Sequence, residues 1–214
     1  MKFANSITDL KKLLKIDEST GFTFFNSFKI YGQINVIQGP VECRSKLVEE
    51  LLKYLNRKAI NTIIVAYSNK NVEKSLYKSS KSISESLVFL SVKEFSLAMN
   101  QTSEVLKQVK NSCIIVNGLN DFETNTSLLS LTETSRILQK NLANFRTLCK
   151  HNNNSLIFLS AISPNYLNYS ADCIVNLDNL SKIKDAYELK VIKNLDPKLN
   201  GLLTGTRLIV SVKD

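Results

Sequence analysis

The stretch INVIQGPVECRSKLVEELLKYL, Ile34 to Leu55, decides the fold of this chain. A short apolar run ends at Gly39-Pro40, five residues follow, and leucines then recur at helical spacing in a helix expected from about Ser45 to Leu55. A strand, a tight loop and a helix in this order are the layout of a phosphate-binding loop. The stretch therefore predicts a strand, loop and helix unit within an α/β domain.

The side chains of that loop do not suit a phosphate. A phosphate-binding loop has the pattern Gly-x-x-x-x-Gly-Lys-Ser/Thr, in which glycines curl the backbone around the anion, the lysine meets the β and γ oxygens and the hydroxyl holds magnesium. With Gly39 as the first glycine and Pro40 after it, Arg44 stands at the second glycine, Ser45 at the lysine and Lys46 at the hydroxyl. Arginine resists a positive φ, and a lysine displaced by one residue is turned by about 100° around a helix. We interpret the loop as a degenerate nucleotide site, with an ordinary Gly-Pro turn as the alternative.

The remaining elements predict one α/β domain. After the first strand, at residues 34–37, apolar β-branched runs predict strands at residues 62–67, 87–90, 113–116 and 155–160, and helical spacing predicts helices at residues 92–109 and 128–149. The end of the chain differs, because DCIVNL, AYELKVIK and TRLIVSV are typical of successive strands. We expect a mostly parallel sheet with helices on both faces and a β-rich antiparallel edge at the carboxyl end. An N-terminal helix over residues 1–20 is expected to precede a core domain over residues 21–214.

Composition narrows the class of protein. The chain has 214 residues, of which 43% are hydrophobic, and no run of residues is apolar and long enough for a signal peptide or a membrane span. The cysteines are far apart, as in buried free thiols of a reducing compartment: Cys43, Cys113, Cys149 and Cys173. The net charge of +9 favours a nucleic-acid surface or an acidic partner, although lysines mixed with acids along solvated helix faces are the alternative. We therefore expect a soluble cytoplasmic protein, located at the nucleoid or, if the source is eukaryotic, in the nucleus, and no membrane partner.

From Phe22 to Asp214 the order of motifs resembles the RecA/RadA recombinase superfamily, which includes smaller paralogues and KaiC-like proteins. YGQINVIQGP stands where that family leads into its phosphate loop, and TIIVAYSNK stands where a strand ends near the activating glutamate. CIIVNGLND is similar to the Walker B strand, SLIFLSAIS to the next core strand, and ADCIVNL with AYELKVIKN to the paired terminal strands. The resemblance implies a RecA-like fold of the P-loop NTPase type, in which nucleotide lies between neighbouring subunits.

The same resemblance implies that the catalytic positions are lost. Asn69 falls at the activating glutamate, and Asn117 replaces the Walker B aspartate. A neutral amide cannot serve as a general base or hold magnesium through a carboxylate. Together with the altered loop, this predicts a pseudo-ATPase that is not an enzyme, with no catalytic residue, no metal and no bound cofactor.

The function implied by the resemblance is that of a non-catalytic paralogue. Such a protein would assist an active RecA-type recombinase, or another RecA-like paralogue, on single-stranded DNA in homologous recombination and DNA repair. AISPNYLNYSAD, Ala161 to Asp172, corresponds to the second DNA-binding loop of the family, where Tyr166 and Tyr169 would stack on bases or instead pack on the domain. A second candidate for DNA binding is the basic strip made by Lys70, Lys74 and Lys78.

Two other functions are compatible with the same residues. One is a KaiC-like or motility-type protein-interaction scaffold that never binds DNA. The other is an ATP-binding protein with an atypical loop, in which Arg44 or Lys46 contacts the phosphates. Salt-dependent binding to single strands separates the recombinase paralogue from the scaffold, and nucleotide in the purified protein would indicate the ATP binder.

Overall fold

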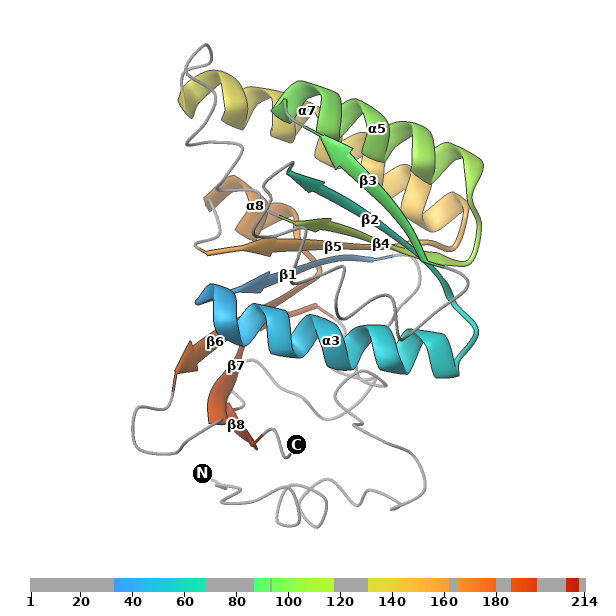
Figure 1. Ribbon diagram of the computed structural model, residues 1–214. Helices are drawn as coiled ribbons and strands as arrows, with labels where there is room; N and C mark the ends of the chain where they lie inside the picture. The colour runs from blue at the N-terminus through green and yellow to red at the C-terminus, as the bar shows by residue number, and fades with distance from the viewer. Residues whose placement is uncertain are drawn as a thin grey trace.

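The computed structural model describes residues 33–67, 87–92, 94–117, 131–161, 165–179, 186–195 and 207–211 (Figure 1). The expected N-terminal helix over residues 1–20 lies outside these residues. The described elements, in chain order, are β1 (Ile34–Gln38), α3 (Val41–Arg57), β2 (Asn61–Tyr67), β3 (Leu87–Val92), α5 (Phe95–Gln108), β4 (Ser112–Asn117), α7 (Leu131–His151), β5 (Ser155–Ser160), α8 (Asn165–Ser170), β6 (Cys173–Asn179), β7 (Ala186–Asn194) and β8 (Arg207–Ser211).

The strands form one eight-stranded sheet in the order β3-β2-β4-β5-β1-β6-β7-β8. The six strands from β3 to β6 in this order pair in parallel, while β7 is antiparallel to both β6 and β8. The prediction of a mostly parallel sheet with an antiparallel edge from the end of the chain is therefore confirmed. A hairpin between β6 and β7 fits the sequence, since only residues 180–185 separate the two strands, fewer than the crossover between parallel strands needs.

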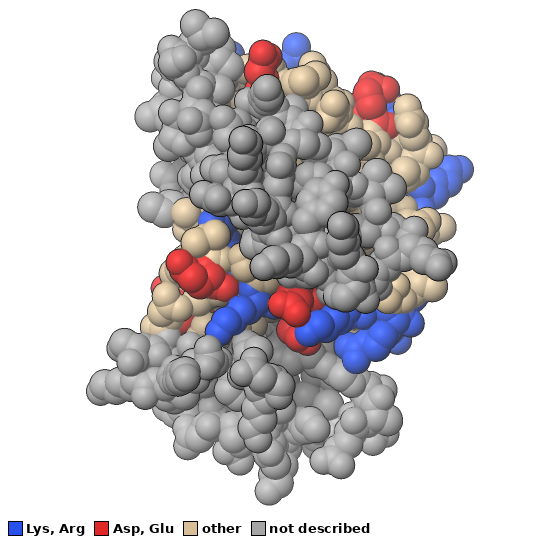
Figure 2. All heavy atoms as spheres, in the orientation of Figure 1, with Lys and Arg blue, Asp and Glu red and all other residues tan. Residues whose placement is uncertain are grey.

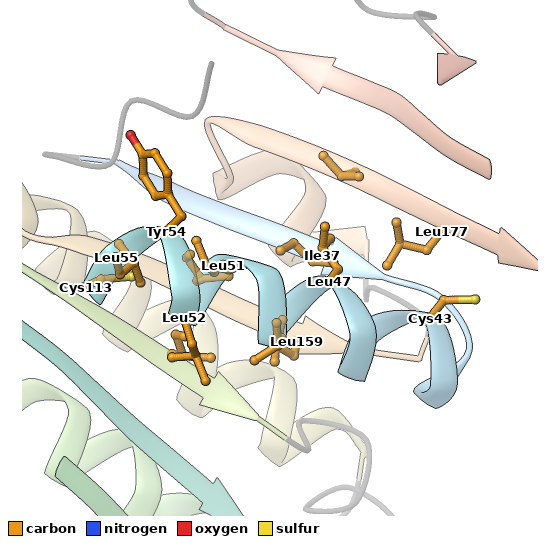
Figure 3. Close-up of a cluster of buried hydrophobic side chains, with 14 of the residues drawn as sticks. Ile37, Cys43, Leu47, Leu51, Leu52, Tyr54, Leu55, Cys113, Leu159 and Leu177 are labelled. Atoms are coloured by element: carbon orange, nitrogen blue, oxygen red, sulfur yellow. The ribbon is translucent and has the colours of Figure 1, made fainter. Parts of the chain in front are cut away.

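Helices cover both faces of the parallel strands, as Figure 1 shows, with α3 on one face and α5, α7 and α8 on the other. Figure 3 shows how Leu47 and Leu51 of α3 face Ile37 of β1 and Leu177 of β6. The opposite face buries residues such as Phe145. Each fully buried side chain of this size contributes about 1.5–3 kcal/mol relative to exposure, so the two clusters together fix which face each helix occupies.

Three helices differ in their bounds from the sequence predictions. The helix expected from about Ser45 begins four residues earlier, at Val41. The helix expected over residues 92–109 begins at Phe95, because Val92 still pairs with Tyr67 as the last residue of β3. The helix expected over residues 128–149 continues to His151, and residues 128–130 of the expected range lie outside the described residues. The first of these differences changes the interpretation of the candidate site.

Candidate functional site

The carboxyl ends of β1 and β5 mark the point where the chain changes direction across the sheet. After β1 the chain passes into α3 on one face, and after the neighbouring strand β5 it passes into α8 on the other face. In open α/β sheets, ligands bind in the crevice outside such a pair of carboxyl ends. The Gly39-Pro40 turn lies at this point, so the sequence placed the candidate site at the position that the topology favours.

Gly39 is held tightly between neighbouring strands. Its backbone N–H donates to the carbonyl oxygens of Ser160, at 3.1 Å, and Ala161, at 3.2 Å, which ties the end of β1 to the end of β5. Its φ is +136°, and a Cβ at this position would collide with the carbonyl oxygen of Leu177 in β6. Only glycine combines this φ with so close an approach, so the structure explains Gly39 by packing alone.

The expected loop after Gly39 is absent, because α3 begins at Val41. Pro40 is the N-cap residue at φ −55°, and the N–H of Arg44 donates to the carbonyl oxygen of Pro40 at 3.0 Å, as in the first turn of a helix. Arg44, Ser45 and Lys46 are therefore half-buried residues of the first two turns of α3. The prediction that five loop residues separate Gly39 from the helix is wrong.

The sequence explains why the helix extends back to the proline. Proline suits the start of a helix because its φ is already helical and its missing N–H needs no partner. Cys43 is buried and continues the apolar spacing of Leu47 and Leu51 back by one turn, and residues 41–46 contain no glycine. This apolar spacing was the signal that could have placed the helix start correctly.

Polar groups around the first turn of α3 bond to one another. The thiol of Cys43 donates to Oδ1 of Asn179 at 2.8 Å, and the amide of Asn176 donates to Asp178 at 2.7 Å. Burial, followed by the negative charges of Glu42 and Asp178, raises the pKa of the Cys43 thiol, although Lys46 acts in the opposite direction. The thiol is therefore neutral at physiological pH and serves as a hydrogen-bond donor rather than as a nucleophile.

The second part of the expected nucleotide machinery is only partly described. Asn117 is the last residue of β4 and pairs with Leu159, while Gln38 of β1 pairs with Ser160. Asn117 thus lies at the same edge of the sheet as Gly39, with β5 between β4 and β1. It brings an amide to this edge instead of a carboxylate. Asn69 lies outside the described residues.

The residues expected to bind DNA lie away from this edge or outside the described part. Residues 165–170 of the expected DNA-binding loop form the short helix α8, so the prediction of a loop there is wrong. Tyr169 is 84% exposed, and its carbonyl oxygen accepts from Lys193 at the amino edge of the sheet, opposite to Gly39. Tyr166 belongs to α8, but its side chain is not described. Lys70, Lys74 and Lys78 lie outside the described residues.

Two groups of polar residues were missed by reasoning from sequence. Asp172 accepts from the N–H of Ile34 and from Arg146, both at 2.9 Å, and so fixes the start of β1. The amide of Asn152 donates to the carbonyl oxygen of Leu106 at 2.7 Å, and that of Asn154 donates to Val109 at 2.9 Å, which caps the end of α5. A run of three asparagines after a helix was the only signal for the second group, and no spacing signalled the first.

Comparisons with known proteins do not assign the site. No model of a protein family matches the sequence, and no curated protein matches it either. Within the described ranges, no three His, Cys, Asp or Glu side chains come together in a group that could hold a metal ion. None of the helices in the same part of the chain has the length and apolar character to cross a membrane.

Proposed function

We propose that this chain is a non-catalytic RecA-like protein that assists an active RecA-type recombinase on single-stranded DNA in homologous recombination and repair. The observation that carries the proposal is the position of Gly39. Gly39 directly follows β1 at the switch point of a parallel sheet, where a nucleotide-binding protein has its phosphate loop, yet α3 begins two residues later. A nucleotide-binding architecture without the phosphate loop is what a subunit that has lost hydrolysis would present.

The start of α3 supports the loss of ATP chemistry. A phosphate loop surrounds the anion with backbone N–H groups that no helix uses. Here the N–H of Arg44 is already bonded to Pro40, and Gly39 donates to Ser160 and Ala161. These two N–H groups would need new partners before they could meet a phosphate. The ATP-binding alternative, with Arg44 or Lys46 on the phosphates, would therefore depend on side chains rather than on the N–H groups of Gly39 and Arg44.

A subunit of this kind would act by completing an interface. In the family that the sequence resembles, nucleotide lies between neighbours, so a subunit without its own site still supplies a surface to an active partner. The exposed side chains of Val41 and Tyr169, at opposite edges of the sheet, are available to a neighbour or to a DNA strand. The chain would then load or stabilise the recombinase without hydrolysing ATP itself.

Capture of the partner under native conditions tests this function. The full chain, carrying an affinity tag, is crosslinked in a lysate of its source, and the captured proteins are identified before and after nuclease digestion. We expect a RecA-type ATPase among them, and we expect the purified pair to hold more recombinase on single-stranded DNA than the recombinase alone. Capture of a protein without a RecA-type ATPase domain, unchanged by nuclease and with no effect on DNA, would indicate the interaction scaffold instead.

A further inference from the structure

Three turns lie side by side at the amino edge of the sheet, opposite to Gly39. They precede β2, β4 and β5, which are consecutive in the sheet, and the registers Asn61 with Ser112 and Cys113 with Ser155 align their starts. Each turn follows the end of a long helix, namely α3, α5 or α7 (Figure 1). We call residues 56–61, 107–112 and 150–155 the basic turns.

The backbone of the basic turns follows one pattern. Each contains one residue with positive φ, and these are Ala59 at 52°, Asn111 at 50° and Asn153 at 54°. This is the left-handed residue that commonly ends a helix. The N–H of Asn111 donates to the carbonyl oxygen of Asn152 at 3.0 Å, and the amide of Asn153 donates to Asn111 at 2.7 Å. The second and third turns are therefore fixed to each other.

The charge of the basic turns is of one sign. They contain no Asp or Glu, and their five cations are all exposed: Arg57, Lys58, Lys107, Lys110 and Lys150. Figure 2 shows blue spheres along the right-hand edge of the molecule, the side at which α3 and α5 end in Figure 1. Only Lys107 among the five has a described salt bridge, to Glu104 at 2.7 Å. The basic turns thus form a surface of several positive charges.

Cations at the carboxyl ends of helices also offset the negative ends of the helix dipoles. The sizes of these charges decide whether the basic turns keep a net positive charge. Each helix carboxyl end carries roughly −0.5 of an elementary charge, so three ends carry roughly −1.5. Glu104 offsets one of the five cations. The surface is therefore still positive by more than two charges, which exceeds what the helices need.

We propose that the basic turns bind the phosphate backbone of single-stranded DNA. This inference rests on the proposed function and assigns the DNA surface to a different edge from the Gly39 turn. Neighbouring strands are about 4.8 Å apart, so the three turns span roughly 10 Å, enough for a few successive phosphates. Tyr169 is 84% exposed and lies at the same edge, beyond β1. Its ring can stack on an unpaired base of a single strand, whereas the bases of a duplex are already stacked on one another.

Binding of a labelled oligothymidine to the full chain, followed by fluorescence anisotropy as salt is varied, tests this inference. The edge variant Lys110→Gln/Lys150→Gln is compared with the control variant Arg136→Gln/Lys140→Gln, which removes the same charge from exposed positions nearer the start of α7. Each lost contact should flatten the log–log salt slope by about 0.7, so the edge variant should lose up to about 1.4 and the control nothing. Thermal melts confirm that both variants fold, and Arg57→Gln/Lys58→Gln provides a second edge variant.

Three results would overturn the inference. They are no binding of the unmodified chain at low salt, equal flattening in the edge and control variants, and equal affinity for a duplex of the same length. The last would refute the choice of a single strand. Tyr169→Ala should weaken binding of the single strand several-fold without changing the slope. Capture of a RecA-type partner is measured in a separate experiment. A negative result in the oligothymidine titration would therefore refute the DNA-binding surface without deciding the proposed function.

Discussion

The carboxylate of Asp172 accepts a hydrogen bond from the guanidinium of Arg146 at 2.9 Å. This pair joins the last third of α7 to the start of β1. The other carboxylate oxygen accepts from the N–H of Ile34, the first residue of β1, at 2.9 Å. The same guanidinium donates to the carbonyl oxygen of Ser170 at 2.7 Å. The two side chains therefore set the position of the strand that leads to Gly39.

Replacement of Asp172 should destabilise the protein. Its side chain is only 17% exposed, so Asp172→Ala leaves the N–H of Ile34 without its acceptor and with little access to water. We expect a loss of about 2 kcal/mol in the free energy of unfolding, measured with urea. Asp172→Asn should lose less, because its amide oxygen can still accept from Ile34. Asp178→Ala, at an exposed position, is the control. Equal losses for Asp172→Ala and Asp178→Ala would contradict this role.

Replacement of Gly39 by alanine should reduce stability by more than the addition of one methyl group usually does. The added Cβ would collide with the carbonyl oxygen of Leu177 and would lie 2.9 Å from the Leu177 Cβ, at a φ that alanine avoids. We expect a loss of at least about 2 kcal/mol, since strained backbone alone contributes about 1–3 kcal/mol. Val41→Ala, two residues away at a half-exposed side chain, should change stability by less than about 1 kcal/mol. Thermal denaturation that leaves Gly39→Ala as stable as the parent would refute the packing argument.

Two of the three asparagines before β5 should differ sharply in the effect of their replacement on stability. Asn154 is fully buried, donates to Val109 and accepts from the N–H of Ser112 at 3.0 Å. Asn154→Asp removes the donor and places a carboxylate against carbonyl oxygens, so we expect a loss of about 3 kcal/mol or more. Asn153→Gly keeps the positive φ at an exposed position and should change stability by less than about 1 kcal/mol. Chemical denaturation of the two variants makes the comparison, and similar losses would contradict the capping role of Asn154.

The cysteines should be unreactive in the folded protein and should make stability depend on alkaline pH. Burial raises the pKa of Cys113, Cys149 and Cys173 from 9.0 to about 12, with a further contribution from Asp172 at the last two. Thiol reagents attack the thiolate, so native labelling at pH 8 should be far slower than labelling in urea. Rapid native labelling of any of the three would show that it is accessible.

The sign of the pH effect follows from the same pKa values. The unfolded chain releases these protons above pH 9.0, whereas the folded chain keeps them up to about pH 12. The stabilisation is therefore fully present below pH 9.0 and is lost as pH rises towards 12. The free energy of unfolding, measured by urea on both sides of pH 9.0, should fall with pH, and it should fall less steeply in Cys113→Ala. A slope unchanged in that variant would contradict the assignment to buried thiols.

The sheet could be predicted from sequence because its signals are local. Residues 155–160 are buried at every position, with an apolar run from Leu156 to Leu159 between two serines, and their predicted ends agree with the structure. The successive terminal strands likewise predicted the antiparallel edge, since residues 180–185 between β6 and β7 are too few for the crossover between parallel strands. The hydrophobic pattern was sufficient to predict these strands because burial of the same apolar side chains stabilises them.

The candidate site could be predicted only in part, because its interactions join residues far apart in the chain. Gly39 was correctly placed at the end of β1, but its reason, the close approach of Leu177, depends on the neighbouring strand β6. The start of α3 was missed because the sequence was aligned to a loop pattern, although Pro40 and Cys43 favour a helix there. Asp172 gave no signal, since its partners Ile34 and Arg146 are 138 and 26 residues away.

The most direct test of the account concerns nucleotide, because the central claim is that a helix has replaced the phosphate loop. Purified full chain is titrated with ATP and magnesium in a calorimeter, and phosphate release is followed with and without single-stranded DNA. We predict no saturable binding and no turnover above background, since Arg44, Ser45 and Lys46 belong to α3 from its first two turns. Magnesium-dependent binding or turnover that is lost in Arg44→Ala or Lys46→Ala, but kept in the control Arg57→Ala, would contradict the claim.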